Sequence, residues 1–261
     1  MYVMKLINKT IKKVQIRIRK VIFKKMTNLQ NIISELKSFG SPERAKHSLR
    51  FFKTGQGQYG EGDIFYGASV PEMRIVSRKY KDINLDDVQE LLKNEYHECR
   101  LVALLILVDR YEHAKNDVER KKICNMYLKN TKYINNWDLV DLSSHEIVGE
   151  YLLDKPKSIL LNLAKSKNLW EKRIAVISTF TFIREGEFNT SLKIAKILIE
   201  DKHDLIQKAV GWMLREIGKR DLRQEETFLK THYKKMGRTA LRYAIEKFPE
   251  GLRQKYLLGK I

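Results

Sequence analysis

The sequence predicts an all-α protein, a HEAT-like α-solenoid of stacked antiparallel helix pairs with a concave basic groove. Apolar residues recur at helical spacing along most of the 261 residues, and no segment alternates as a strand would. Only 13 glycines and four prolines interrupt the chain. Comparable positions in every second predicted helix follow one another at a period of about 35 residues, which is typical of stacked helical hairpins. These positions are Arg100, Trp137, Arg173, Lys208 and Arg242.

The composition indicates a globular chain with a polyanionic partner. Hydrophobic residues make up 43%, and 51 Lys and Arg against 32 Asp and Glu give a net charge of +19. Nucleic acid is the usual partner of such a charge and an anionic membrane a less common one, while a Lys-rich composition without binding meaning is the alternative. Cys99 and Cys124 have no metal-binding spacing and are expected to be free core thiols in a reducing compartment. No apolar run approaches the ~20 residues of a membrane span.

Residues 1–25 form a basic N-terminal arm that is predicted to be separate from a single repeat domain at 26–261. The arm carries nine Lys or Arg and no Asp or Glu, so that the remaining body has a charge of 19 − 9 = +10. A basic amphipathic segment can lie on a membrane or bind nucleic acid. It can also be an upstream extension, with Met26 as the true start.

The first predicted elements of the body surround a glycine-rich connection. A helix is expected at 28–39, and Ser41 as N-cap with Pro42 behind it starts a second one that reaches about Lys53. A further helix starts at Pro71. The connection at 54–69 spells GxGxxG, but it lacks the preceding strand of a dinucleotide site, and we predict a long structured connection instead. Its aromatic residues can anchor it to the body or contact a ligand.

Helical patterns then follow one another with short breaks. They lie at about 85–94, 97–112, 116–129, 137–153, 157–166, 169–184, 188–200, 203–218, 222–234, 238–247 and 249–258.

The stretch NNWDLVD at 135–141 is the first candidate site. Asn135 or Asn136 caps the expected helix, and Asp138 falls in its first turn, where the helix dipole favours an anion. Trp137 and Asp141 are four residues apart and share a face. A ring beside a carboxylate can be core packing with capping, or it can be a functional site.

Two later helices each carry one residue that does not fit a simple core pattern. Arg173 falls inside an apolar stripe and needs an anionic partner, because burying it alone costs several kcal/mol. By register, Asp141 is the nearest candidate, either as a structural pair or as a pair that meets a ligand. Trp212 lies almost opposite the apolar stripe of its helix, between Lys208 and Arg215. It can pack on the next repeat, or it can face DNA with the two cations on phosphates.

Other chemistries lack their motifs. His145–Glu146 does not continue to HExxH because Gly149 stands at the position of the second histidine, and there is no GxSxG elbow. No metal or cofactor is expected, so any catalysis would depend on carboxylates, aromatic rings and Arg.

Three motifs together resemble the AlkD-type DNA alkylation repair glycosylases, which are HEAT-like repeat proteins. They are NNWDLVD at 135–141, LWEKR at 169–173 and IQKAVGWMLREIGK at 206–219, and the resemblance extends from about residue 28 to 258. The family excises cationic N3- and N7-alkylated purines from double-stranded DNA without inserting the base into a deep pocket. The resemblance implies that Asp141 is the catalytic carboxylate, that Trp137 and Trp212 pack against the deoxyribose of the lesion, and that Arg173 holds a phosphate and positions Asp141.

The resemblance and the basic residues extend the predicted DNA contacts. Lys208 and Arg215 would bind phosphates, and Phe51 and Lys53 stand where the family has an aromatic residue that contributes near the lesion. Since a Phe has no hydroxyl, Tyr59 of the connection is a candidate replacement. We expect a monomeric, monofunctional DNA glycosylase in the bacterial cytoplasm, associated with the nucleoid through its substrate. The alternatives are a non-catalytic DNA- or RNA-binding repeat protein and a scaffold for acidic protein partners.

Overall fold

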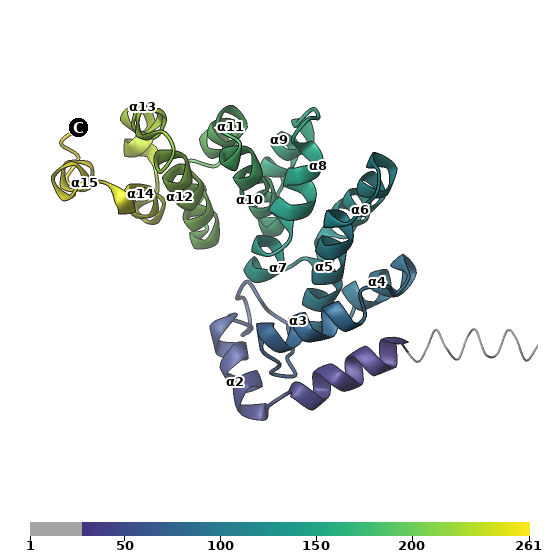
Figure 1. Cartoon of the computed structure of the whole chain (residues 1–261). Helices are drawn as coiled ribbons and strands as arrows, with labels where there is room; N and C mark the ends of the chain where they lie inside the picture. The colour runs from purple at the N-terminus through teal and green to yellow at the C-terminus, as the bar shows by residue number, and fades with distance from the viewer. Residues whose placement is uncertain (1–27) are drawn as a thin grey trace, which may run out of the picture. The chain divides into compact units, whose positions relative to one another are not determined.

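In the computed structural model, residues 28–261 are described, and their regular structure is helical (Figure 1). Within this range no strand forms, apart from an isolated bridge between Ile64 and Tyr96. The predicted all-α helical-repeat fold is therefore confirmed. None of the described helices has the length and apolar character needed to cross a membrane. The predicted basic arm, 1–25, lies outside the described residues.

The helices follow the predicted ranges closely. The first spans residues 28–39. It is followed by α2 (Pro42–Phe51), α3 (Val70–Lys79), α4 (Leu85–Leu92), α5 (His97–Glu112), α6 (Asp117–Lys129), η1 (Thr131–Tyr133), α7 (Trp137–Asp141), η2 (His145–Gly149), α8 (Glu150–Leu152), α9 (Ser158–Ala164), α10 (Leu169–Arg184), α11 (Asn189–Ile197), α12 (Asp204–Gly218), α13 (Leu222–His232), η3 (Tyr233–Lys235), α14 (Arg238–Ala244), η4 (Ile245–Lys247) and α15 (Glu250–Leu257).

The chain divides into two compact units between Ile106 and Leu107, inside α5. The second unit consists of two rows of helices. In one row α10 packs against α7 and η2 on one side and against α12 on the other, and α12 packs against α14. The second row contains α9, α11 and α13, which pack against α10 and α12. This is the pairwise stacking that the period of about 35 residues predicts.

Apolar stripes form the core of the second unit. The predicted stripe of α12 is fully buried, with exposed fractions of 1% or less for Ile206, Val210, Met213, Leu214 and Ile217. The thiols of Cys99, in the first unit, and Cys124, in the second, are free and buried as predicted.

Two glycines allow neighbouring helices of the second unit to approach closely. A Cβ atom on Gly149 would lie 2.5 Å from the Ser178 carbonyl oxygen, and one on Gly211 would lie 2.5 Å from Cβ of Tyr243. Because real Cβ atoms do not come so near other heavy atoms, each helix pair could keep its spacing only with glycine at these positions.

The glycine-rich segment 54–69 of the first unit is a structured connection. The Glu98 carboxylate at the start of α5 accepts hydrogen bonds from the backbone N–H groups of Tyr66 (3.1 Å) and Gly67 (2.7 Å). Asp63 forms an ion pair with Arg100 and a hydrogen bond with His97 Nδ1 (3.0 Å), and all three residues are buried. Two charged contacts therefore fasten the connection to α5.

Two aromatic residues of this connection also anchor it. The ring of Phe65 stacks on Phe52, with centroids 5.2 Å apart, and the ring of Tyr66 stacks on Tyr96 at 3.7 Å.

One predicted helix, 137–153, is not a regular α-helix. After α7 the chain makes a turn, continues as the π-helix η2 and ends as α8. Side-chain hydroxyls bind the carbonyls there: Ser143 Oγ donates to Leu139, and Thr181 Oγ1 donates to His145 at 2.7 Å. Such competition for carbonyl oxygens disturbs the regular α-helical hydrogen bonds and widens the helix locally.

Candidate functional site

The site begins at α7, where Asn136 is the N-cap. Its side-chain oxygen accepts the backbone N–H of Trp137 at 2.8 Å, and Asp138 lies in the first turn with 7% exposure. Asp141 ends α7, and its side chain is 16% exposed. The two carboxylates thus differ in position: Asp138 is buried near the helix start, and Asp141 retains access to solvent.

Asp141 and Arg173 form a two-pronged ion pair between neighbouring helices. Arg173 Nε donates to Asp141 Oδ1 at 2.8 Å, and Nη2 donates to Oδ2 at 2.7 Å. A third donor, Nη1, binds the Leu205 carbonyl oxygen at 2.6 Å in the first turn of α12. With a side chain only 6% exposed, Arg173 links α7, α10 and α12 and fixes the plane of the Asp141 carboxylate.

Burial governs the protonation of Asp141. It raises the pKa of this carboxyl above the usual value, and the charge and hydrogen bonds of Arg173 oppose that rise. The carboxylate is therefore a partly desolvated anion whose charge depends on a single guanidinium. In such surroundings an anion interacts strongly with any positive charge that develops close to it.

A row of aromatic rings lies on the same group of helices as the ion pair, about two helical turns from Arg173 at Phe180. The ring of Phe180, on α10, is 6.1 Å from that of Trp212 on α12 and 5.5 Å from that of His145 on η2. Phe180 is two helical turns beyond Arg173, and His145 is one turn beyond Asp141. Burial lowers the pKa of His145, which keeps its ring neutral near neutral pH.

Glu216 fixes the orientation of Trp212. Trp212 Nε1 donates to Glu216 Oε1 at 3.2 Å, and the same oxygen accepts Lys219 Nζ at 2.6 Å. Arg220 Nη1 lies 3.4 Å from the other oxygen. Burial raises the pKa of Glu216, but these hydrogen bonds and charges outweigh it and lower the pKa below the usual value. The indole is thus tied to an ionised, charge-compensated carboxylate.

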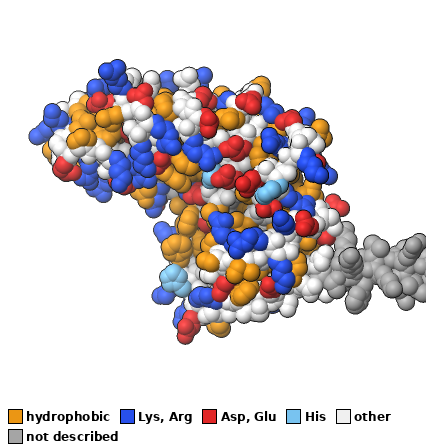
Figure 2. Space-filling view, in the orientation of Figure 1, with side chains coloured by type: hydrophobic (Ala, Val, Ile, Leu, Met, Phe, Trp, Pro, Cys, Tyr) orange, Lys and Arg blue, Asp and Glu red, His pale blue; other side chains and the backbone are white. Residues whose placement is uncertain are grey.

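The two predicted phosphate-binding cations of α12 are engaged in ion pairs. Lys208 Nζ is 2.7 Å from Asp204 Oδ2, and Arg215 pairs with Glu246. Figure 2 shows Lys and Arg side chains along the edge of the second unit where α12 and α14 lie. DNA binding through Lys208 and Arg215 would require these pairs to exchange a carboxylate for a phosphate.

The remaining predicted DNA contacts belong to the first unit, where they lie close together at the end of α2. Phe51 is 54% exposed, and its carbonyl oxygen accepts the Tyr59 hydroxyl at 3.4 Å. Lys53 has a φ of 52°, and its carbonyl oxygen accepts the N–H of Gly60 at 3.1 Å. The side chains of Phe51, Lys53 and Tyr59 therefore lie on a backbone turn that the connection closes.

The sequence analysis missed His145, Phe180 and Glu216 as parts of the site. His145 was considered only as a zinc ligand, and Phe180 and Glu216 were not singled out. Phe180 lies seven residues after Arg173 and Glu216 four after Trp212, so helical spacing from the predicted residues could have found both. The position of His145 depends on the π-helix, where the hydroxyl of Thr181 from another helix binds the His145 carbonyl oxygen.

The arrangement can stabilise a cation beside an aromatic surface. In the described part of the chain, no three His, Cys, Asp or Glu side chains converge as metal ligands do. What the site offers is one oriented carboxylate, partly exposed, with Trp137 on the same helix and a row of rings on the neighbouring helices.

A comparison with protein-family models identifies one family for this chain. A family model described as "DNA alkylation repair enzyme" matches residues 32–248. A solved structure described as a predicted DNA alkylation repair enzyme from Enterococcus faecalis is 17% identical and has a TM-score of 0.62. The match covers 81% of this chain and 97% of that one, and at this identity it shows the fold alone. No curated protein sequence matches significantly.

Proposed function

The chain belongs to the DNA alkylation repair enzyme family, and we propose that it is a monofunctional DNA glycosylase for alkylated purines. Its substrate is a cationic N3- or N7-alkylated purine in double-stranded DNA, and the reaction is hydrolysis of the N-glycosidic bond. The family membership supports a role in DNA repair. The contacts of Asp141 support the specific chemistry.

The proposed reaction needs anionic stabilisation more than proton transfer. An alkylated purine already carries a positive charge, so it leaves without protonation by a strong general acid. As the bond breaks, positive charge develops on the sugar. A carboxylate next to that sugar stabilises the charge and orients a water molecule for attack at C1′. Asp141 is the residue proposed for this role.

The other predicted site residues each have a role in the proposal. Arg173 is a positioning residue, since its hydrogen bonds hold the carboxylate and keep it ionised. Trp137 and Trp212 would pack against the deoxyribose of the lesion, where the electron-rich faces of the rings favour a cation. Of the two roles implied for Arg173, the observed contacts favour positioning over phosphate binding, because the guanidinium is almost fully buried.

Duplex DNA is the proposed partner. The positive charge of the chain supplies affinity for phosphates, which should fall steeply with salt. A monomer suffices for the proposed chemistry, since the second unit contributes Trp137, Asp141, Arg173 and Trp212. The proposed substrate places the enzyme at the bacterial nucleoid in the cytoplasm.

The observation that carries the proposal is the two-pronged Asp141–Arg173 pair with its carboxylate still open to solvent. The test is release of 7-methylguanine and 3-methyladenine from methylated duplex DNA, followed by chromatography. We expect both bases to be released faster than in protein-free DNA. Binding of the duplex without release of either base would instead favour a non-catalytic DNA-binding protein.

A further inference from the structure

Helix α2 of the first unit has an exposed surface that ends in an aromatic ring. None of its residues is buried, and Phe51, the last of them, is 54% exposed. The next residue, Phe52, is half-buried, and its ring centroid lies 5.2 Å from that of Phe65 and 4.9 Å from that of His97. Phe52 therefore supplies the packing at this end of the helix, while more than half of Phe51 stays in contact with solvent.

Three cations close to Phe51 in the chain have no carboxylate partner. Lys46, Arg50 and Lys53 are exposed, and none of them forms an ion pair within residues 28–261. Residues 1–27 contain no Asp or Glu, so they hold no partner either. Figure 2 shows Lys, Arg and His side chains together where α2 lies. This uncompensated charge favours a polyanion as the partner of α2.

The rings and the cations occupy two neighbouring rows of the helix. His47 and Phe51 are four residues apart, and their rings stack with centroids 6.0 Å apart and an interplanar angle of 19°. Lys46 and Arg50, each one residue earlier, form the adjacent row. A nucleic-acid strand has a matching pattern, because its bases can stack on aromatic rings while its phosphates bind cations alongside.

Lys53 extends this surface in an unfavourable backbone conformation. Its φ of 52° is the only positive value of a non-glycine residue in the described part of the chain. The N–H of Gly60 donates to the Lys53 carbonyl oxygen at 3.1 Å and helps to hold the turn. Glycine would adopt this conformation without strain, so a lysine at this position indicates a use for its side chain.

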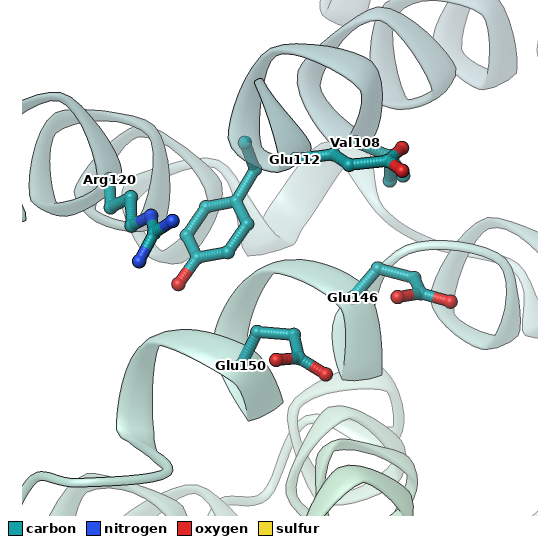
Figure 3. Close-up of a pocket in the computed structure, with 6 residues that line it drawn as sticks. Val108, Glu112, Arg120, Glu146 and Glu150 are labelled. Atoms are coloured by element: carbon teal, nitrogen blue, oxygen red, sulfur yellow. The ribbon is translucent and has the colours of Figure 1, made fainter. Parts of the chain in front are cut away.

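Two surfaces of the second unit suit a DNA strand less well. On α12, Lys208 and Arg215 are already paired with carboxylates. A cavity of about 400 Å³ between α5, α6, η2 and α8 has three carboxylates and one guanidinium in its lining, those of Glu112, Glu146, Glu150 and Arg120 (Figure 3). Carboxylates repel phosphates, so the unpaired cations of α2 are the better match for a strand.

The exposed ring favours unpaired bases over a duplex. In a duplex each base is stacked on its neighbours, and the grooves expose only the base edges. In a single strand the bases can expose their faces, and stacking on an aromatic side chain is favourable for every base.

We propose that α2 binds single-stranded DNA, with an unpaired base on the rings of Phe51 and His47 and with phosphates on Lys46, Arg50 and Lys53. This binding goes beyond the proposed glycosylase reaction, whose substrate is a duplex. Its test uses unmodified DNA and no release of a base, so the two proposals can fail independently.

The test compares two single strands that carry the same number of phosphates. One is an oligothymidine of about ten nucleotides, and the other is an abasic tetrahydrofuran strand without bases. In fluorescence anisotropy with the full chain, the wild type should bind the oligothymidine at least about fivefold more tightly, because only this strand can stack. Phe51→Ala should bring the ratio of the two affinities close to one.

Two further variants control for loss of apolar surface and loss of fold. Val118→Ala truncates a side chain that is 78% exposed in the second unit, and it should keep the wild-type ratio. Phe51→Leu keeps an apolar side chain and removes the aromatic face, so it should lower the ratio as Phe51→Ala does.

The contribution of the cations is measured separately. Lys46→Gln/Arg50→Gln should reduce the slope of log affinity against log salt by about 1.4 for both strands, since each phosphate contact to a single strand contributes ~0.7. An unchanged slope would overturn the phosphate contacts.

The stacking contact has its own decisive outcomes. It is overturned if the wild type binds the two strands equally, or if Phe51→Ala keeps the wild-type ratio. A blunt duplex of the same sequence should bind Phe51→Ala as it binds the wild type. Equal losses of affinity for the duplex and for the oligothymidine would also overturn the proposal, because they would indicate a contact that needs no unpaired base.

Discussion

Replacement of Arg173 by Met tests whether this residue acts through Asp141. The substitution keeps the long aliphatic part of the side chain and removes the guanidinium that binds both Asp141 oxygens and the Leu205 carbonyl. Burial already raises the pKa of Asp141, and Arg173 opposes that rise. In Arg173→Met this opposition is lost, so the carboxyl should bind a proton at a higher pH than in the wild type.

The expected magnitude follows from the two lost charge-assisted hydrogen bonds. Each contributes about 1.5–3 kcal/mol, and one pKa unit corresponds to about 1.4 kcal/mol, so the pKa should rise by at least one unit. The proposed reaction needs the ionised form, so the acid limb of the activity profile should move to higher pH by the same amount. A carboxyl group whose pKa is higher in the folded state than in the unfolded state stabilises the fold at any pH below its unfolded-state pKa. This contribution to the free energy of unfolding is lost as the pH rises through the folded-state pKa. The variant should therefore be least stable, relative to wild type, at neutral and higher pH.

The assay is single-turnover release of 7-methylguanine from methylated duplex DNA as a function of pH, corrected for spontaneous depurination. Lys172→Met is the matched control, because it removes a cation from the same helix that pairs with Asp201 at 2.7 Å instead of Asp141. The control should keep the acid limb of the wild type. An unchanged acid limb in Arg173→Met would refute the positioning role.

Three further predictions concern other residues. Glu216→Ala should lower kcat/KM about tenfold and alter Trp212 fluorescence, whereas Glu216→Gln, which keeps an acceptor, should lose less. Lys208→Ala should reduce the slope of log affinity for duplex DNA against log salt by about one, as measured by fluorescence anisotropy; an unchanged slope would exclude a phosphate contact. Burial raises the pKa of Glu225 to about 9, far above its unfolded value, so this group's contribution to stability is lost as pH rises towards 9. In denaturant titrations, Glu225→Gln should therefore lose less stability than wild type between about pH 5 and pH 9, and parallel curves would contradict this.

Local signals in the sequence were sufficient for most of the fold. The cap at Ser41, the apolar stripe of α12 and a cap at Asn135 or Asn136 depend on neighbours within one or two helical turns. The structure has the first two as predicted and Asn136 as the third. The π-helix η2 was not predictable in this way. It depends on hydroxyl groups such as that of Thr181, which lies 36 residues away in the chain.

The candidate site shows the same division. The pairing of Arg173 with Asp141 followed from the sequence. An Arg inside an apolar stripe needs an anionic partner, and the helical register makes Asp141, one repeat earlier, the nearest candidate. The row formed by His145, Phe180 and Trp212 requires that η2, α10 and α12 lie in register. Because η2 is a π-helix, regular helical spacing does not place His145 in this row. The roles of these residues in catalysis stay predictions until the reaction is measured.

The most direct test of the central claim compares wild type with Asp141→Asn in single-turnover release of 7-methylguanine from methylated duplex DNA, with duplex affinity measured in parallel. Asn keeps the size of the side chain and removes its charge. The account predicts release by the wild type and at least a ~100-fold slower rate for Asp141→Asn, with duplex binding retained. Wild-type release that Asp141→Asn matches in rate would contradict the assignment of Asp141 as the catalytic carboxylate.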